Sequence, residues 1–491
     1  MGLRLFWITF AGVFASQTIG TVHVLLSNRV LFLAMADLHD RGLLTVPNEQ
    51  ILPSLGEMGP ALFGGLFFTF TLGIGLTVLT LLFVQTIRSA PGTSRFLFSG
   101  FLLLFFAFCL ISVNKNGFNP VGSAYFLFPP ALTAGLALRF LPGKDPGASP
   151  WKIAVPTLFF LFSLPFLVPV TGLDFFHQVR DRVLLSHPWG IAANDFYYRY
   201  TLHAAEAVKS FQQKLIRTYR IDGTLDGDKA TLLNKSLNYE DVFLVSSPAA
   251  DLVLEEKGDA LSLGTPDGQV LQVDLRSMLT DPSEFLERYS TRTDRWGFFR
   301  KGTFCSMIVF YPAALFFLIY TLITCFLPQG AGPRRGPLFA SGFSFLLLAG
   351  AAFLLSPGKN LPASFPNLPT MIQSGNPGEQ GRALRMIFSH GPDIASFPRY
   401  DALGKSPSVI VRYWFARCLE KSRSEKATAL LLALMEDGQI NVATTAIEVL
   451  AKRGDRGVIP EIRNKLIRSD HWYVQWYAYR ALRRLGWCQA G

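Results

Sequence analysis

One polar cluster that could carry chemistry lies inside an apolar stretch near the N-terminus. Gln17 and His23 interrupt the run from Leu5 to Leu26, which is otherwise rich in apolar residues. An imidazole at such a position could bind a quinone or a lipid headgroup, whereas a hydrogen bond to a neighbouring helix is the simpler alternative, which we favour. These two residues form a candidate intramembrane polar site.

Other signals for catalysis or metal binding are weak. Asp222, Asp226 and Asp228 imitate the start of a calcium-binding loop, but Leu233 occupies the twelfth position, where a glutamate is required. HExxH, GxSxG, Walker A, dinucleotide-binding and CxxCH motifs are absent. Of the seven His residues only His23 lies in an apolar stretch, which argues against a bis-histidine haem. We therefore expect no catalytic residue, no metal and no cofactor.

The composition indicates a membrane protein. Half of the 491 residues are hydrophobic, only 16% are charged, and the mean hydropathy is +0.30. A membrane-spanning helix needs about 20 apolar residues. We predict seven such spans: Leu5 to Leu26, Ala61 to Val84, Phe96 to Val113, Val121 to Leu141, Ile153 to Thr171, Phe304 to Leu327 and Leu338 to Leu355.

Lys and Arg residues in the short loops predict the orientation. The loops expected on one face carry Arg4, Arg88, Arg95, Arg139, Lys144, Lys152, Arg334 and Arg335. By the positive-inside rule this face is cytoplasmic. With seven spans the N-terminus is cytoplasmic and the C-terminus is outside, in a bacterial inner membrane. No span carries a charged residue near its middle, which argues against ion-coupled transport.

The charged residues concentrate in two polar regions. We divide the chain into a membrane domain (1–172, five spans), an extracytoplasmic α+β domain (173–302), two further spans (303–356) and a C-terminal helical domain (357–491). In the α+β domain we predict a helix from Ala193 to Leu215, strands near 242–245, 252–263 and 270–275, turns at Lys257-Gly258 and Asp267-Gly268, and a short helix near 282–289. Of the five cysteines only Cys418 and Cys488 lie in the polar regions, and two free thiols are favoured over a bridge.

The C-terminal domain contains an internal repeat of 31 to 32 residues. This shift aligns Val411, Val442 and Val474, and then Leu419, Leu450 and Leu482. Gly454 aligns with Gly486, where each helix should stop. The apolar positions recur every three or four residues, so each unit is predicted to be a pair of amphipathic helices that stack on their neighbours.

This repeat resembles the HEAT-like repeats of the phycobilisome-lyase type. The resemblance is carried by VRYWFARCLEKS (411–422), NVATTAIEVLAKRGDRGVIPEIRNKLIRSD (441–470) and YVQWYAYRALRRLGW (473–487), and it covers roughly 407–487. It implies an α-solenoid that binds protein, and it does not imply lyase activity. The Val-Arg step of such repeats is present at Val411-Arg412 but becomes Val442-Ala443 and Val474-Gln475, so no role of that arginine is carried over.

The last repeat helix is crowded with aromatic and basic side chains. The candidate partner-binding residues are Trp472, Tyr473, Trp476, Tyr477, Arg480, Arg483 and Arg484. Trp, Tyr and Arg are the residues that dominate interface hot spots. The alternative is that this helix caps the repeats and its aromatic side chains pack on the preceding repeat or on the membrane surface.

The charge of the C-terminal domain limits the choice of partner. From Pro357 onward there are 19 Lys or Arg and 11 Asp or Glu, a net charge of +8 out of +11 for the whole chain. An acidic protein or anionic lipid headgroups would be attracted, whereas nucleic acid is not expected outside the cytoplasm.

Three functions from different classes remain open. We favour a non-catalytic membrane scaffold or accessory subunit that binds a periplasmic protein. A transporter of a neutral or lipidic substrate, which needs no buried charge, is the second. The third is a membrane enzyme or a quinone-linked redox subunit, for which Asp37, Asp40 and Asp174 could serve as bases near the outer interface.

Overall fold

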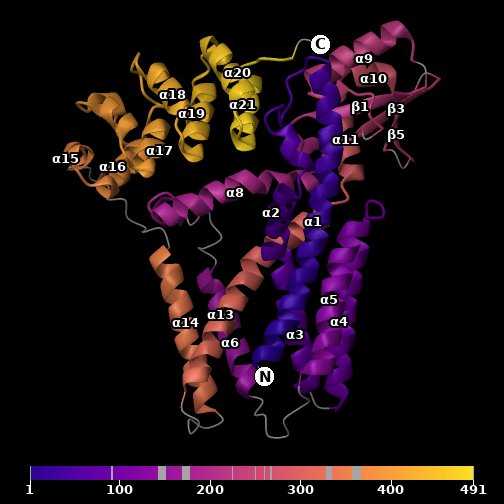
Figure 1. Cartoon of the computed structure of the whole chain (residues 1–491), viewed down its shortest axis with the longest axis vertical. Helices are drawn as coiled ribbons and strands as arrows, with labels where there is room; N and C mark the ends of the chain where they lie inside the picture. The colour runs from indigo at the N-terminus through magenta and orange to yellow at the C-terminus, as the bar shows by residue number, and fades with distance from the viewer. Residues whose placement is uncertain are drawn as a thin grey trace.

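Helices make up most of the computed structural model, which also contains one five-stranded sheet. It describes residues 2–89, 92–141, 151–167, 177, 179–223, 225–248, 250–258, 260–265, 268–327, 334–355 and 367–489. Long apolar helices lie side by side at one end, where the N-terminus is found, and the sheet and a row of shorter helices lie at the other (Figure 1).

Five helices are long and apolar enough to cross a membrane, where the sequence predicts seven. They are Arg4–Asp40, Met58–Arg88, Arg95–Val113, Pro120–Phe140 and Arg335–Ala352. The other two predicted spans correspond to shorter apolar helices, Val155–Leu164 and Leu315–Thr324. Residues 168–171 of the predicted fifth span lie outside the described residues. The sixth is divided between two helices with a π-helical turn between them.

The elements of this part are α1 (Gly2–Asp40), α2 (Met58–Phe68), α3 (Ile74–Ser89), α4 (Gly92–Val113), α5 (Pro120–Phe140), α6 (Trp151–Leu167), α12 (Gly297–Cys305), α13 (Tyr311–Phe326) and α14 (Arg335–Leu355). A π-helical turn, Thr69–Gly73, joins α2 to α3. At 1.5 Å per residue α1 is about 58 Å long, nearly twice the hydrocarbon thickness. Its second half therefore extends toward the sheet, well past the predicted end at Leu26 (Figure 1).

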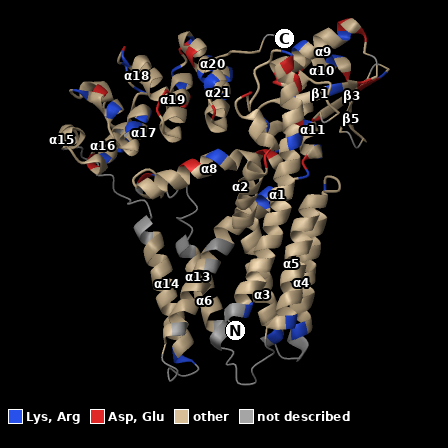
Figure 2. Cartoon of the chain, in the orientation of Figure 1, with Lys and Arg blue, Asp and Glu red and all other residues tan. Residues whose placement is uncertain are grey.

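Arginine side chains close the ends of α3 and α5 near the N-terminus. Arg88 donates to the carbonyl groups of Leu138 and Leu141, and Arg95 donates to that of Ile87 at 3.2 Å. Carbonyl groups in the last turn of a helix have no partner within the helix, and basic side chains satisfy them. Lys and Arg gather at this end of the long helices (Figure 2).

The sheet has the strand order β2-β1-β3-β4-β5. Its strands are β1 (Arg217–Asp222), β2 (Val242–Leu244), β3 (Leu252–Lys257), β4 (Ala260–Thr265) and β5 (Gly268–Asp274), and its helices are α9 (Gly227–Tyr239), α10 (Leu275–Thr280) and α11 (Pro282–Thr293). β1 pairs in parallel with β2 and β3, and the other pairs are antiparallel. The predicted strand over 252–263 is two strands joined at Lys257-Gly258, where the turn was expected.

The predicted helix from Ala193 to Leu215 is wrong at both ends. The observed helix, α8, spans Pro188–Ala207. A new turn begins at Ser210, whose side chain forms a capping box with Gln213, and β1 follows. β1 and α9 were not predicted, because RTYRID has only two apolar residues, Tyr219 and Ile221, and the α9 sequence is only weakly apolar.

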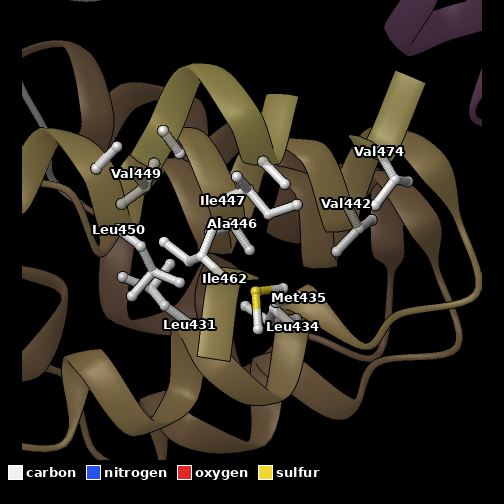
Figure 3. Close-up of a cluster of buried hydrophobic side chains, with 14 of the residues drawn as sticks. Leu431, Leu434, Met435, Val442, Ala446, Ile447, Val449, Leu450, Ile462 and Val474 are labelled. Carbon is white, nitrogen blue, oxygen red and sulfur yellow. The ribbon is translucent and has the colours of Figure 1, made fainter. Parts of the chain in front are cut away.

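The C-terminal helices form a helical array, residues 368–484. They are α15 (Leu368–Gln373), α16 (Pro377–His390), α17 (Val409–Cys418), α18 (Ala427–Met435), α19 (Ile440–Arg453), α20 (Ile459–Arg468) and α21 (Trp472–Arg484). α17, α19 and α21 pack together as one layer, and α18 and α20 pack against it as a second. Val442 and Val474 from the repeat lie buried between these helices (Figure 3). Gly454 and Gly486 both have positive φ at helix ends, as the repeat predicts.

One hydrophobic core joins the helical array to distant parts of the chain. Its members outside the array come from the end of α1, the segment after it, α8 and the residue Leu185 before it, and residues in or next to β1 and β2 and just before β3: Ala34, Met35, Leu38, Val46, Ile51, Leu52, Leu55, Leu185, Leu202, Ile216, Phe243, Val245 and Ala250. Hydrophobic burial of this extent fixes the array to the other elements.

Buried hydrogen bonds reinforce this junction. Asn48 and Gln475 exchange two bonds, with Asn48 N to Gln475 Oε1 at 2.9 Å and Gln475 Nε2 to Asn48 Oδ1 at 2.7 Å. The Asn48 amide also donates to carbonyl groups at the end of α20, including that of Leu466 at 2.8 Å. The side chain of Gln489 forms two hydrogen bonds with the backbone of Leu44. It accepts from the Leu44 N–H at 2.7 Å and donates to the Leu44 carbonyl at 2.9 Å.

We predict that Asn48→Ala lowers the free energy of unfolding by about 2–4 kcal/mol, because it removes the buried bond from Gln475 Nε2 and takes the Asn48 donor away from the carbonyl groups of Leu466 and Ile467. Denaturant unfolding of the purified chain in detergent, followed by tryptophan fluorescence, measures this. The control is Gln50→Ala in the same segment, where the side chain is exposed. Equal stability of the two variants would contradict the prediction.

Candidate functional site

Gln17 joins α1 to α2. Its amide nitrogen donates to the carbonyl of Leu62 at 2.9 Å and to Thr21 Oγ1 at 3.0 Å, and its amide oxygen accepts from Thr69 at 2.6 Å. Hydrogen bonds of this kind hold apolar helices together where the surroundings offer few other polar partners. The contacts of Gln17 fit the interpretation that it forms hydrogen bonds between neighbouring helices.

His23 lies farther along α1 and contacts α8. Its Nε2 lies 3.0 Å from the carbonyl oxygen of Ala207 in the last turn of α8, and its ring lies 4.4 Å from that of Trp296, centroid to centroid. Because a carbonyl oxygen only accepts, Nε2 must carry the proton. Five residues farther along α1, Asn28 Nδ2 lies 3.1 Å from His203 Nδ1, again linking α1 to α8. Gln17 and His23 therefore bond to different elements and do not face one another across a ligand site.

Three of the seven candidate partner-binding residues are used inside the molecule. Trp472 is 4% exposed and packs edge-on against His203 of α8 at 5.0 Å. Tyr473 makes a similar contact with Tyr198 of α8 at 4.7 Å. Arg483 forms an ion pair with Asp241, which immediately precedes β2, with Nε and Oδ2 2.9 Å apart. These side chains bind parts of the same chain.

The other four candidates remain accessible. Arg480 and Arg484 are exposed, and Trp476 and Tyr477 are half-buried. Arg480 lies over the ring of Trp476 at 4.5 Å, a cation–π contact that orders both side chains. Positions 476, 480 and 484 are one helical turn apart, so they form a single stripe along α21.

The junction between the array and the sheet contains a buried charged cluster. Asp241 accepts from the hydroxyl of Tyr479 at 2.7 Å in addition to its pair with Arg483. Burial raises the pKa of Asp241, and the hydrogen bond from Tyr479 and the charge of Arg483 partly oppose the rise. The carboxylate is enclosed by partners that hold it, so its geometry is that of a structural anchor.

A second anchor joins α8 to the array. Asn194 Nδ2 donates to Asn441 Oδ1 at 2.6 Å, and the Asn441 amide donates to the hydroxyl of Tyr198 at 3.2 Å. Just before α8, Asp181 accepts from the indole of Trp414 at 2.9 Å. No local pattern marks these residues, since each is a lone polar residue whose partner is more than 230 positions away in the sequence.

The remaining candidates lie apart from one another. Asp37 pairs with Arg41 at 3.3 Å, and Asp174 lies outside the described residues. Asp222 ends β1 and pairs with Arg220, and Asp226 precedes α9, so the calcium-like sequence forms a strand-to-helix turn. Cys418 and Cys488 are free thiols. Among the described residues no group of three or more His, Cys, Asp or Glu could hold a metal ion.

Comparisons of the chain with protein-family models, with curated proteins and with solved structures gave no match.

Burial lowers the pKa of His203 and of His471 from 6.5 to about 4, and Arg199 adds to the effect at His471. The unfolded chain takes up these protons below pH 6.5 while the folded chain does not, so stability falls as the pH drops from 6.5 toward 4. We predict that His203→Gln removes part of this loss, on the order of 3 kcal/mol at most by pH 4.

Thermal unfolding of the purified chain across this pH range provides the measurement. His187→Gln is the control, because His187 is exposed. An unchanged slope of stability against pH in His203→Gln would contradict the prediction.

Proposed function

We propose that this chain is a non-catalytic membrane scaffold or accessory subunit that binds an extracytoplasmic protein through its helical array. The observation that carries the proposal is the accessible stripe of Trp476, Arg480 and Arg484 on an array whose other contacts fix it to the same chain. A partner would meet a surface that is already ordered, which lowers the entropy cost of binding.

In this proposal the array is an α-solenoid of HEAT-like repeats. Its support is the stacking of α17, α19 and α21 as one layer with the repeated valines buried at equivalent positions. Solenoids of this class present extended surfaces to proteins. The stripe is basic, so the partner is expected to be acidic.

The proposal also places seven spans in a bacterial inner membrane. Five helices meet the length and composition of a span, and α6 and α13 pack against one of them, α14, through Phe160, Phe316 and Leu348. The arginines at the N-terminal end of the bundle favour a cytoplasmic location for that end. The sheet and the array then lie outside the cytoplasm.

We predict that alkaline phosphatase fused after Gly491 is active and that green fluorescent protein fused there is dark, because only the phosphatase matures outside the cytoplasm. Fusions after Lys144 should give the reverse pattern, since that loop is expected on the cytoplasmic side. A fluorescent fusion after Gly491 would overturn the proposed topology.

We predict that Arg480→Glu weakens co-purification of a stoichiometric partner from native membranes by about 10- to 100-fold, because charge reversal at a central Arg opposes an acidic surface. Quantitative mass spectrometry of the mild-detergent eluate measures the loss. Arg463→Glu is the matched control, with the same charge change on the exposed side of α20, in the other layer. Equal recovery with both variants would contradict the assignment of the stripe.

A further inference from the structure

Helix α8 has two faces with different surroundings. Ile191, Asn194, Tyr198 and Leu202 recur every three or four residues and face the array, where Leu202 joins its core and Asn194 bonds to Asn441. Figure 1 shows α8 lying across the foot of the array, between it and the long apolar helices. The face opposite the array is therefore turned toward those helices.

That opposite face is aromatic and exposed. Trp189, Phe196 and Tyr200 recur at helical spacing, and Trp189 and Phe196 are 63% and 43% exposed. Ala193, between them, is exposed as well. Trp472 of the array reaches this side of the helix at His203, one turn beyond Tyr200.

The aromatic face continues directly into the exposed surface of a candidate membrane span. Phe63 of α2 packs on Phe196 at 5.4 Å and on Tyr200 at 4.7 Å, and the two α8 rings lie 5.0 Å apart. In the first turns of α2, Met58 and Leu62 are 60% and 42% exposed. These residues belong to the start of the span Met58–Arg88, so the face lies at the level where that span leaves the membrane.

We infer that the aromatic face of α8 is an interfacial membrane anchor that rests in the phospholipid headgroups of the extracytoplasmic leaflet. Aromatic side chains with an apolar body and a polar edge concentrate at that depth. A helix lying in the membrane plane keeps all but its terminal backbone groups hydrogen-bonded within itself, so it tolerates this position. The continuity with α2 favours lipid over a protein partner, which would have to enter the bilayer to reach Phe196. This inference rests on the membrane embedding proposed above.

The test places the photoreactive residue p-benzoylphenylalanine at one position at a time in the full chain. The purified chain is reconstituted into nanodiscs of phosphatidylethanolamine and phosphatidylglycerol, irradiated and examined by intact mass spectrometry for phospholipid adducts. Test positions are Trp189 and Phe196. Leu103 on α4, 71% exposed, reports membrane embedding, and Arg463 on α20 reports a surface in water. Each variant must first unfold at the temperature of the unmodified chain.

The inference requires phospholipid adducts at positions 189 and 196 at a yield about tenfold above that at 463 and comparable to that at 103. Adducts at 103 without adducts at 189 and 196 overturn the inference and leave the membrane embedding intact. Adducts to another protein chain at 189 or 196 also overturn it. Absence of adducts at all three apolar positions overturns the embedding and the inference together.

Discussion

The junction between the helical array and the second half of α1, with the segment that follows it, is the constraint on which the rest of the structure depends. Its apolar part is a single core that the array shares with α1, the segment after it, α8 and the sheet. Its polar part is the pair of hydrogen bonds between Asn48 and Gln475, both nearly inaccessible to water. Burial supplies most of the free energy, and the amides fix the register, because a shifted packing would leave them unpaired. The array is therefore an integral part of the fold and not a tethered module.

The long helices associate by a different balance of forces. Small residues bring α1, α2 and α5 into close approach: a methyl group on Gly20 would lie 2.6 Å from the hydroxyl of Tyr125, and one on Gly65 would lie 2.8 Å from the backbone nitrogen of Thr21. In apolar surroundings, close packing of this kind and occasional polar bonds such as those of Gln17 replace the hydrophobic effect. α8 lies at the boundary between the two regimes, with amides toward the array and aromatic rings toward the long helices.

The features of the fold that could be predicted from the sequence are those that follow from local periodicity. The array helices, the stops at Gly454 and Gly486 and most strands follow from spacing that a short window contains. The length of α1 did not follow, because residues beyond Leu26 lose the uniform apolar pattern while they pack against distant elements. The inward positions of Trp472 and Arg483 were equally out of reach, since their partners, His203 and Asp241, are more than 230 residues away in sequence. The candidate partner-binding residues were thus predicted from their residue types alone. Only the structure shows which of them pack inside the molecule and which remain accessible.

The two hydrogen bonds between Leu44 and Gln489 join residues that lie 445 positions apart in the chain. Until α21 has been synthesised, the apolar side chains of the segment after α1 cannot pack on it and are exposed in the nascent chain. The packing of this segment on α21 is therefore a late, long-range step of folding. Its entropic cost grows with the length of chain between the two elements. A chain without α21 would leave these apolar side chains exposed, and exposed apolar surface of this kind favours aggregation.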